Sequence, residues 1–281
     1  MRAIRWMTAA MLAGTLAATG DTTTDPVYKF AWSENVGWMN ACPKNNEVTV
    51  HYYEETGGWL SGYIWCENIG WIVMGNSSGG PYGNTTRRTW GVNVDANGDL
   101  SGYAWGENVG WISFDHPLCD AAINPTNGVF SGHAWGENIG WLTFKGVSPD
   151  YGVRSMAFYT QPHGTPNWWL DTYAVSESYD AGDGVQAWQK YVMDVDPTIA
   201  SNDLRITAIS TTSTNRTITF TPASTRRSYT LSRRDDLTAG NWSNVAGQSG
   251  IRYTKGSIKT LQDTHTTTQM FYRVTVTVGS E

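Results

Sequence analysis

The chain has 281 residues and a formal net charge of −6, with 25 acidic against 19 basic side chains. Fifteen tryptophans, fourteen tyrosines and thirty glycines accompany only 16% charged residues, a composition typical of a β protein with many tight turns. The length allows about two domains. The acidic balance and the lack of a recognisable nucleic-acid-binding motif argue against nucleic acid as a partner.

The first twenty residues have the pattern of a secretory leader. Arg2 and Arg5 give a basic start, an apolar run covers Met7 to Ala18, and small residues follow it. This run is too short for a transmembrane helix, which needs about 20 apolar residues. We therefore expect residues 1–20 to be a signal peptide, with a retained N-terminal segment as the alternative. The protein is then secreted, without a transmembrane segment.

Residues 21–160 contain four copies of the motif Trp-x-Glu-Asn-x-Gly-Trp, for example AWGENVGW and AWGENIGW. The copies start 33, 40 and 30 residues apart, a spacing found in propeller blades, prisms and solenoid units. In the third copy, the alternating run WGVNVD, an Asn-Gly turn and the runs LSGYAW and WISF indicate three strands. We predict a Trp-rich repeat β domain at 21–160, built like a propeller, a prism or a β-roll.

Each motif predicts a structural turn rather than a catalytic site. Its Asn and Gly tolerate positive φ, and its two tryptophans can face each other across a hairpin mouth. We expect the Glu carboxylate to accept N–H groups of its own loop. Glycoside hydrolysis needs two carboxylates in unlike environments, so four equivalent copies argue against an enzyme. The turn residues are Trp32, Glu34, Asn35, Trp38, Trp65, Glu67, Asn68, Trp71, Trp105, Glu107, Asn108, Trp111, Trp135, Glu137, Asn138 and Trp141.

Three details of the repeats lead to further predictions. Gly102 and Gly132 should leave room for an indole or a neighbouring backbone. His133 takes the place of a tyrosine in two other copies, which predicts a packing role. The first copy lacks its leading strand, which either residues 152–160 or a neighbouring subunit could supply, because exposed sheet edges are liabilities.

An odd number of cysteines allows at most one disulfide within the chain, and export favours one, with the pairing left open. The leftover thiol could bridge two chains. The three cysteines are Cys42, Cys66 and Cys119. Four N-x-Ser/Thr sequons mark candidate glycosylation sites in surface loops. They are Asn76, Asn84, Asn215 and Asn241.

Residues 161–203 predict a short helical linker. Pro166 suits the first turn of a helix, and the Asp-rich loop SESYDAGDG precedes VQAWQKYVM. The stretch resembles the PxWW…DxDGDGxxNxxEY…TDP linker of large secreted bacterial surface proteins, whose loop is similar to an EF-hand calcium loop.

The resemblance implies a calcium site, but Lys190 stands where the last calcium ligand is expected. We predict that its ammonium replaces the ion by pairing with Asp180 or Asp183, so that no cofactor is needed. A working calcium site is the alternative. Its candidate ligands are Asp180, Asp183, Asp194 and Asp196.

Residues 204–281 contain short alternating runs such as LRITAIS, RTITFTP and RSYTLSR, separated by turn residues, as in a β-sandwich. YTLSRRDDLTAGNWSNVAG and FYRVTVTV resemble the fibronectin-III-like C-terminal modules of the same secreted proteins. The four Trp repeats are similar to GYAWGENIGW repeats of uncharacterised bacterial surface proteins. The whole chain is therefore predicted to be all-β, with a repeat domain, a helical linker and a fibronectin-III-like sandwich. The resemblances imply a cell-surface location and bring no known reaction.

The two parts of the chain differ in charge sign. Asp21 to Asp203 carries 21 acidic and 7 basic residues, and Arg205 to Glu281 carries 4 and 10, giving −14 and +6. An acidic head could bind the basic tail of the next copy. We predict a structural protein of the bacterial surface that associates with copies of itself, head to tail, into an extracellular, glycosylated fibre.

The alternative is a carbohydrate-binding adhesion module that uses the repeat aromatics and has glycans as partners. We expect the motif tryptophans to lie in the core, which favours the fibre. Solvent exposure of Trp105, Trp111, Trp135 and Trp141 would favour the carbohydrate-binding module instead.

Overall fold

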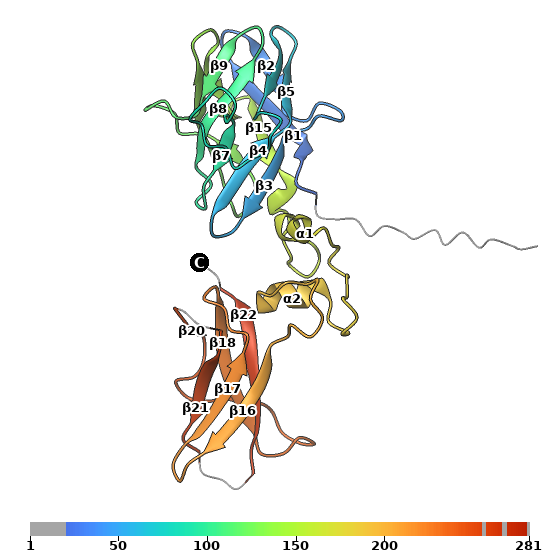
Figure 1. Cartoon of the computed structure of the whole chain (residues 1–281), viewed down its shortest axis with the longest axis vertical. Coiled ribbons are helices and arrows are strands. Elements are labelled where there is room, and N and C mark those ends of the chain that lie inside the picture. The colour runs from blue at the N-terminus through green and yellow to red at the C-terminus, as the bar shows by residue number, and fades with distance from the viewer. Residues whose placement is uncertain (1–20, 255–256, 266–268, 280–281) are drawn as a thin grey trace, which may run out of the picture.

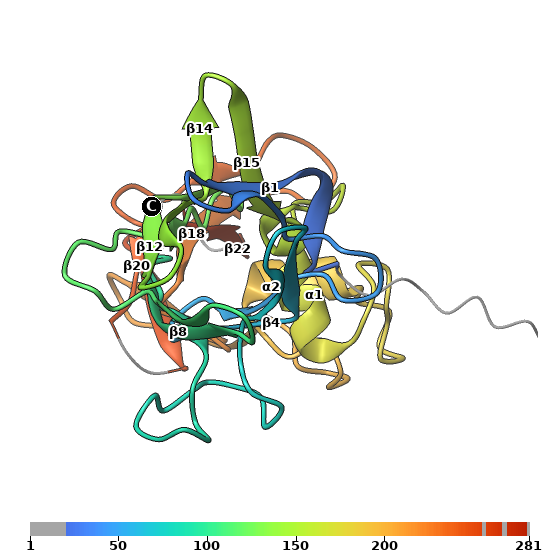
Figure 2. The same ribbon diagram turned by 90° about the horizontal axis from the view of Figure 1, so that it is seen from above.

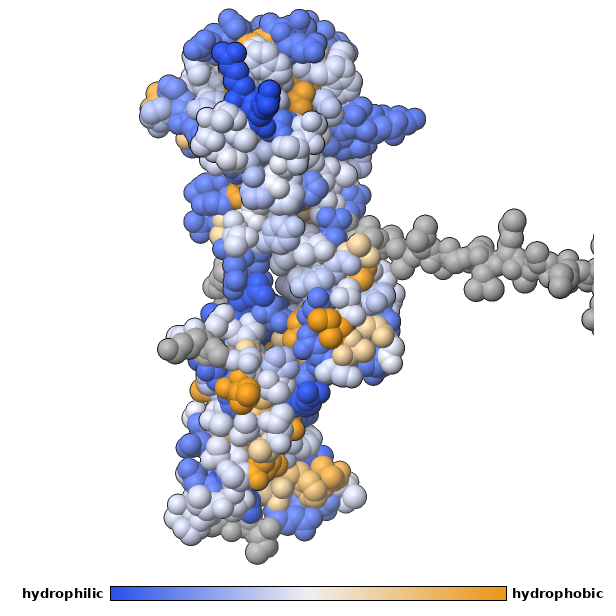
Figure 3. Space-filling view, in the orientation of Figure 1, coloured by the Kyte–Doolittle hydropathy of each residue, from blue (hydrophilic) through white to orange (hydrophobic). Residues whose placement is uncertain are grey.

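The computed structural model describes residues 21–254, 257–265 and 269–279, so the expected signal peptide lies outside the described residues. Three parts follow one another along the long axis: a β-barrel, two short helices and a second β unit (Figure 1; Figure 3). Strands are the main regular structure of the described residues, and only two short helices accompany them, which confirms the all-β prediction. The helices are α1 (Asn167–Tyr173) and α2 (Ala187–Met193), with a 3-10 turn at Met156–Phe158.

Each motif copy forms one β-hairpin, and the four hairpins close into an eight-stranded barrel. The hairpins are β1–β2 (Thr24–Ser33, Gly37–Asn40), β5–β6 (Tyr63–Cys66, Gly70–Val73), β8–β9 (Leu100–Gly106, Gly110–Ser113) and β12–β13 (His133–Gly136, Gly140–Thr143). Strand β2 pairs with β5, β6 with β8, β9 with β12, and β13 with β1. Neighbouring repeats are thus joined edge to edge by hydrogen bonds. This arrangement is a closed barrel and not the expected propeller, prism or roll.

The leading strand of each repeat lies toward the other end of the barrel. There β3 (Thr49–Tyr53) pairs with β4 (Gly57–Ser61), β7 (Val92–Val94) with the start of β8, and β10 (Ala122–Ile123) with β11 (Phe130–Ser131).

The first repeat receives its leading strand from the end of the domain. Strand β15 (Asp150–Ser155) pairs with β1, with Thr24 opposite Ser155. Strand β14 (Lys145–Val147) pairs with β15, and this hairpin projects from the side of the barrel when seen from above (Figure 2). Of the two sources left open by the sequence, the chain's own residues supply the strand, and no neighbouring subunit is needed for it.

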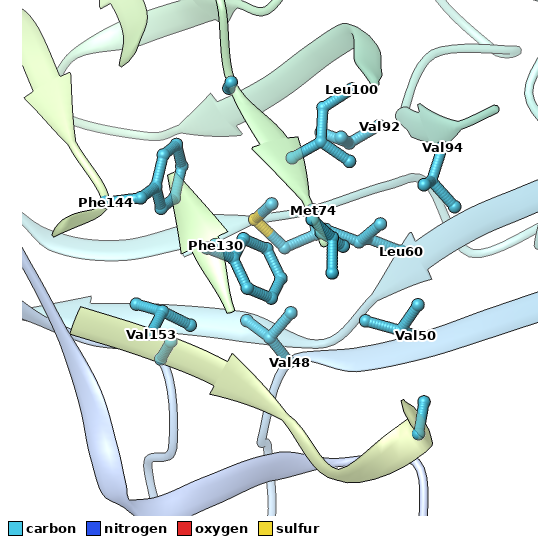
Figure 4. Close-up of a cluster of buried hydrophobic side chains, with 14 of the residues drawn as sticks. Val48, Val50, Leu60, Met74, Val92, Val94, Leu100, Phe130, Phe144 and Val153 are labelled. Carbon is cyan, nitrogen blue, oxygen red and sulfur yellow. The ribbon is translucent and has the colours of Figure 1, made fainter. Parts of the chain in front are cut away.

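Small and aliphatic side chains fill the barrel. In the hairpins, the inward positions include Ala31, Ala104 and Ala134, each at most 1% exposed. Larger residues from the leading strands and the hairpin ends fill another part of the interior, where Phe130, Phe144 and Met74 lie together (Figure 4). The alternation along each strand therefore points the motif tryptophans, which neighbour these alanines, to the outside.

Two glycines let the leading segment of a repeat approach its own hairpin closely. Gly102 has φ +88, and a Cβ there would lie 2.2 Å from the backbone oxygen of Gly91, directly before β7. Gly132 has φ +73, with the oxygen of Asp120 at 2.0 Å. The prediction that these glycines make room for a neighbouring backbone is confirmed.

The C-terminal unit consists of two antiparallel sheets. The first contains β16 (Arg205–Thr211), β17 (Arg216–Thr221) and β21 (Lys259–Asp263). The second contains β18 (Arg227–Arg234), β19 (Ser243–Asn244), β20 (Ile251–Arg252) and β22 (Phe271–Val278). Both sheets contribute to one buried cluster, which includes Ile218, Tyr229 and Leu261.

Two neighbouring arginines join the C-terminal unit to the rest of the molecule. The Arg227 side chain is 1% exposed, and it donates to the carbonyl oxygens of Tyr191 (2.7 Å) and Val192 (3.0 Å) in the last turn of α2. Arg226 donates from Nε to Asp194 at 2.9 Å and lies 3.3 Å from a carboxylate oxygen of Glu54 in the barrel. Because these contacts reach both the linker and the barrel, the three parts are held in a defined arrangement.

Candidate binding groove

Each hairpin carries three aromatic rings on the outer surface of the barrel, here called a triad. In the third repeat these are Tyr103, Trp105 and Trp111. The two tryptophans lie opposite each other in the strand register, with ring centroids 4.6–4.9 Å apart in all four repeats. The third ring meets the second tryptophan edge-on at 5.8–6.2 Å. His133 is the third ring of the fourth triad, as its predicted packing role requires.

The second tryptophan of every triad is exposed to solvent. Trp111 is 42% exposed and Trp141 is 36% exposed, while Trp105 and Trp135 are half-buried. The expectation that these indoles form the core is therefore wrong. The barrel interior at this level holds an alanine on one strand of three hairpins and Ile64 in the second, and an indole would not fit there.

The turns between the tryptophans differ from the expected geometry. Positive φ occurs at the motif glycine, for example +77 at Gly110, and not at the motif asparagines. The asparagines instead donate to a carbonyl of the preceding repeat. Asn35 donates to Ile139 (3.2 Å), Asn68 to Val36 (2.9 Å), Asn108 to Ile69 (3.0 Å) and Asn138 to Val109 (3.0 Å). These four hydrogen bonds form a ring that links every turn to its neighbour.

The motif glutamates are exposed, and none of the four accepts an N–H of its own loop within the residues that the structure describes. The predicted role of these carboxylates in holding the turn is therefore wrong. They remain available at the barrel surface.

The asparagine ring leads to a prediction for Asn108. Replacement by alanine removes one hydrogen bond to the Ile69 carbonyl and is expected to cost about 1 kcal/mol. Replacement by valine is expected to cost about the same, because the backbone there does not have positive φ. Thermal unfolding of both variants measures this. A valine variant that is much less stable than the alanine variant would contradict the assignment.

A groove of about 940 Å³ lies between the third and fourth hairpins. Its aromatic lining includes Trp105 and Trp111 from one hairpin and Trp135 from the next. Trp90 forms a side wall and meets Trp111 edge-on at 5.3 Å. His116, from the loop after β9, lies 6.2 Å from Trp135 between ring centroids. The groove therefore brings triads of two repeats together with side chains from two loops.

The side wall of the groove comes from a long connection. Eighteen residues, 74–91, separate β6 from β7, against eight between β2 and β3 and eight between β9 and β10. The sequon residues Asn76 and Asn84 brace this segment: Asn76 donates to the carbonyl of Trp90 at 3.0 Å, and Asn84 accepts the N–H of Gly91 at 3.0 Å. The other sequon residues, Asn215 and Asn241, lie in the C-terminal unit.

The remaining predicted sites do not come together with the groove. All three cysteines are free thiols, so the candidate disulfide is not formed. The Cys66 thiol is buried and donates to the Val36 carbonyl at 3.5 Å, while Cys119 donates to Ser113 at 3.3 Å. Burial raises the pKa of Cys42 and of Cys119.

Lys190 occupies the centre of the Asp-rich loop. Its buried ammonium lies 2.7 Å from Asp183 and 2.5 Å from Asp203, so the predicted pairing is with Asp183 rather than Asp180. The Asp180 carboxylate instead accepts three N–H groups of its own loop. Asp194 pairs with Arg226, and Asp196 accepts from Thr198. Among the described residues, no group of three or more His, Cys, Asp and Glu side chains is placed to hold a metal ion.

The Lys190 pair predicts a loss of stability in acid. The hydrogen bond from Lys190 lowers the pKa of Asp183 to about 2. In the unfolded chain the pKa of an Asp carboxyl is about 3.9. The stabilisation by the Lys190–Asp183 pair is therefore complete above that pH and is lost as the pH falls toward 2. The melting temperature of the wild type should therefore fall over this interval, and that of Asp183→Asn should fall less steeply. Parallel curves for the two proteins would contradict the prediction.

Neither helix in the described part of the chain has the length and apolar content needed to span a membrane. Comparison of the chain with protein-family models, with curated proteins and with solved structures gives no match.

Proposed function

We propose that the protein is a carbohydrate-binding adhesion module of a bacterial surface, and that the groove between hairpins β8–β9 and β12–β13 is its binding site. The observation that carries this proposal is the exposure of motif tryptophans on a rigid barrel, with Trp111 42% exposed inside the groove lining. The C–H faces of sugar rings pack against indole faces, so a sugar chain fits such a surface. Exposed motif tryptophans are expected of a carbohydrate-binding module, whereas buried ones are expected of a structural fibre.

The size and composition of the groove also support a ligand site. Its volume, about 940 Å³, lies within the range of roughly 300–1,000 Å³ that is usual for small-molecule pockets. Aromatic rings provide much of its lining, and a few polar groups lie among them. The rings are preorganised, because each tryptophan is held by its cross-strand partner and by the barrel hydrogen bonds. Little ordering is then needed when a ligand binds.

The fourfold repeat provides matched controls for a test. Trp135 lines the groove, while Trp32 has the same place in the first triad and does not line it. We expect Trp135→Ala to weaken glycan binding by about tenfold or more, equal to about 1.4 kcal/mol, and Trp32→Ala to leave it within about twofold. A glycan array followed by titration calorimetry measures this. Equal effects of the two substitutions, or no glycan bound by the wild type, would overturn the proposal.

The C-terminal unit fits the same context. Its three-stranded and four-stranded sheets around one core support the assignment to a fibronectin-III-like module. Together with the secretory pattern of residues 1–20 and the resemblance of the repeats to bacterial surface proteins, this favours a secreted, surface-located protein. In this proposal the C-terminal unit is a spacer that holds the barrel away from its point of attachment.

Head-to-tail self-association is the second candidate function. The pairing of β15 with β1 completes the first repeat within the chain, so strand exchange between subunits no longer supports a fibre. The charge difference of −14 against +6 between the two parts still favours association. Contacts between exposed charges are screened beyond about 8 Å at physiological ionic strength. Light scattering should then show oligomers at low salt that dissociate at moderate salt, and a monomer at every salt concentration would exclude this function.

A further inference from the structure

The polar groups in the groove indicate which class of glycan it takes. Arg87 and Glu137 are the charged groups of the lining, and both are exposed without a hydrogen-bond or ion-pair partner among the described residues. Asn138 uses its amide N–H on the Val109 carbonyl at 3.0 Å, so its own carbonyl oxygen remains an acceptor. His116 accepts the N–H of Leu118 at Nδ1 (3.2 Å), which places its ring proton on Nε2 as a donor.

The groove therefore offers donors and acceptors in comparable number, with one positive and one negative charge. A sugar hydroxyl both donates and accepts, so a mixed set of this kind suits a ligand rich in hydroxyl groups. An ionised ligand would need an excess of one charge sign, which this lining does not provide.

The surroundings of the groove disfavour an anionic ligand. Residues 21–160 carry 14 acidic and 6 basic side chains, so the barrel that holds the groove has a net negative charge. A negative field lowers the local concentration of anions and slows their association. Polysaccharides that carry carboxylate or sulfate groups are thus disfavoured, despite the presence of Arg87.

We propose that the groove selects a neutral glycan and that the two carboxylate oxygens of Glu137 accept hydrogen bonds from adjacent hydroxyls of one sugar ring. This inference rests on the proposed function of the groove. Glu137 differs from its three repeat equivalents because it lines the groove, whereas Glu34, Glu67 and Glu107 do not. Hydrogen bonds to an ionised carboxylate are stronger than those to a neutral amide, so Glu137 is the specificity-determining acceptor.

The test compares Glu137→Gln with Glu107→Gln, which makes the same chemical change at the equivalent position outside the groove. The ligands are neutral oligosaccharides of glucose, mannose and N-acetylglucosamine, and acidic oligosaccharides of galacturonate. We expect neutral ligands to bind, Glu137→Gln to weaken them by about tenfold, and Glu107→Gln to change affinity by less than about twofold. The affinity should not change between low and moderate salt, because no net ligand charge is involved.

Two results would overturn this inference while leaving the proposed function intact. One is tighter binding of the galacturonate oligosaccharides, with an affinity that falls with salt. The other is an equal effect of Glu137→Gln and Glu107→Gln on a glycan whose binding is still abolished by Trp135→Ala. If the wild type binds no glycan of either class, both the inference and the proposed function fail. Circular dichroism of each variant checks that the barrel is folded.

Discussion

Replacing Arg227 with alanine is expected to destabilise the protein by about 3–5 kcal/mol. The buried guanidinium makes two hydrogen bonds to carbonyl oxygens at the end of α2, and each bond from a charged donor contributes about 1.5–3 kcal/mol. Its carbon atom also lies 5.1 Å from the centre of the Tyr191 ring, in a cation–π contact. The substitution removes these contacts and leaves the part-buried Val192 carbonyl without this donor, while the Tyr191 carbonyl keeps only the N–H of Asp194. Denaturation by guanidinium, followed by circular dichroism, measures the loss.

Arg205→Ala is the control for this experiment. Arg205 also donates to a carbonyl oxygen, that of Ser201 at 3.2 Å, but its side chain is exposed, so its loss should cost about 0.5 kcal/mol or less. Similar midpoints for the two variants would show that Arg227 does not hold the linker to the C-terminal unit.

Replacing Gly102 with alanine is expected to cost about 3 kcal/mol. An added Cβ would meet the Gly91 backbone oxygen at 2.2 Å, and the residue would also be held at φ +88, where side chains are strained. The clash lies between β8 and the backbone directly before β7, so these two segments of the third repeat would have to separate to relieve it. Thermal unfolding of the variant measures the effect.

Gly182→Ala separates the two causes. Gly182 has φ +99, but no atom lies within 4 Å of the position of its Cβ, so only the backbone strain of about 1 kcal/mol remains. If Gly102→Ala costs no more than Gly182→Ala, the close approach of the neighbouring strand is not important for stability.

Local patterns in the sequence predict the repeat units well. The alternating runs and the conserved spacing of Trp, Gly and Trp within each copy indicate a hairpin, and each copy forms one. The packing role of His133 and the close backbone approach at Gly102 also follow from comparing one copy with another. These features depend on a few neighbouring residues, which is why a local pattern contains them.

The closure of the barrel and the side on which the tryptophans lie depend on contacts between repeats. The pairing of β13 with β1 joins residues more than a hundred positions apart, and no local pattern specifies it. The sequence nevertheless contains an indication that the indoles point outward. Alanine precedes the first tryptophan in three copies, and a small residue is what a narrow interior requires. A single copy does not indicate the role of the motif asparagine, because its acceptor belongs to another repeat.

The groove could be located in part from sequence. The 40-residue spacing between the second and third motif copies exceeds the other two and indicates an insertion there. The contact of Trp90 with Trp111 depends on how residues 74–91 fold back onto the barrel. Side-chain hydrogen bonds such as that of Asn76 determine this fold. Sequence reasoning therefore indicates an unusual loop but not the cavity beside it.

The pairing of Thr24 with Ser155 brings the two ends of the barrel domain next to each other. A short peptide could join them, and the chain could then be opened between any two repeats. Such a circular permutant would begin at a different repeat and keep the same barrel. Ring closure also sets the order of events during synthesis. The ribosome releases β1 first, and the ring cannot close until β13 has emerged. The first repeat is complete only when β15 has followed.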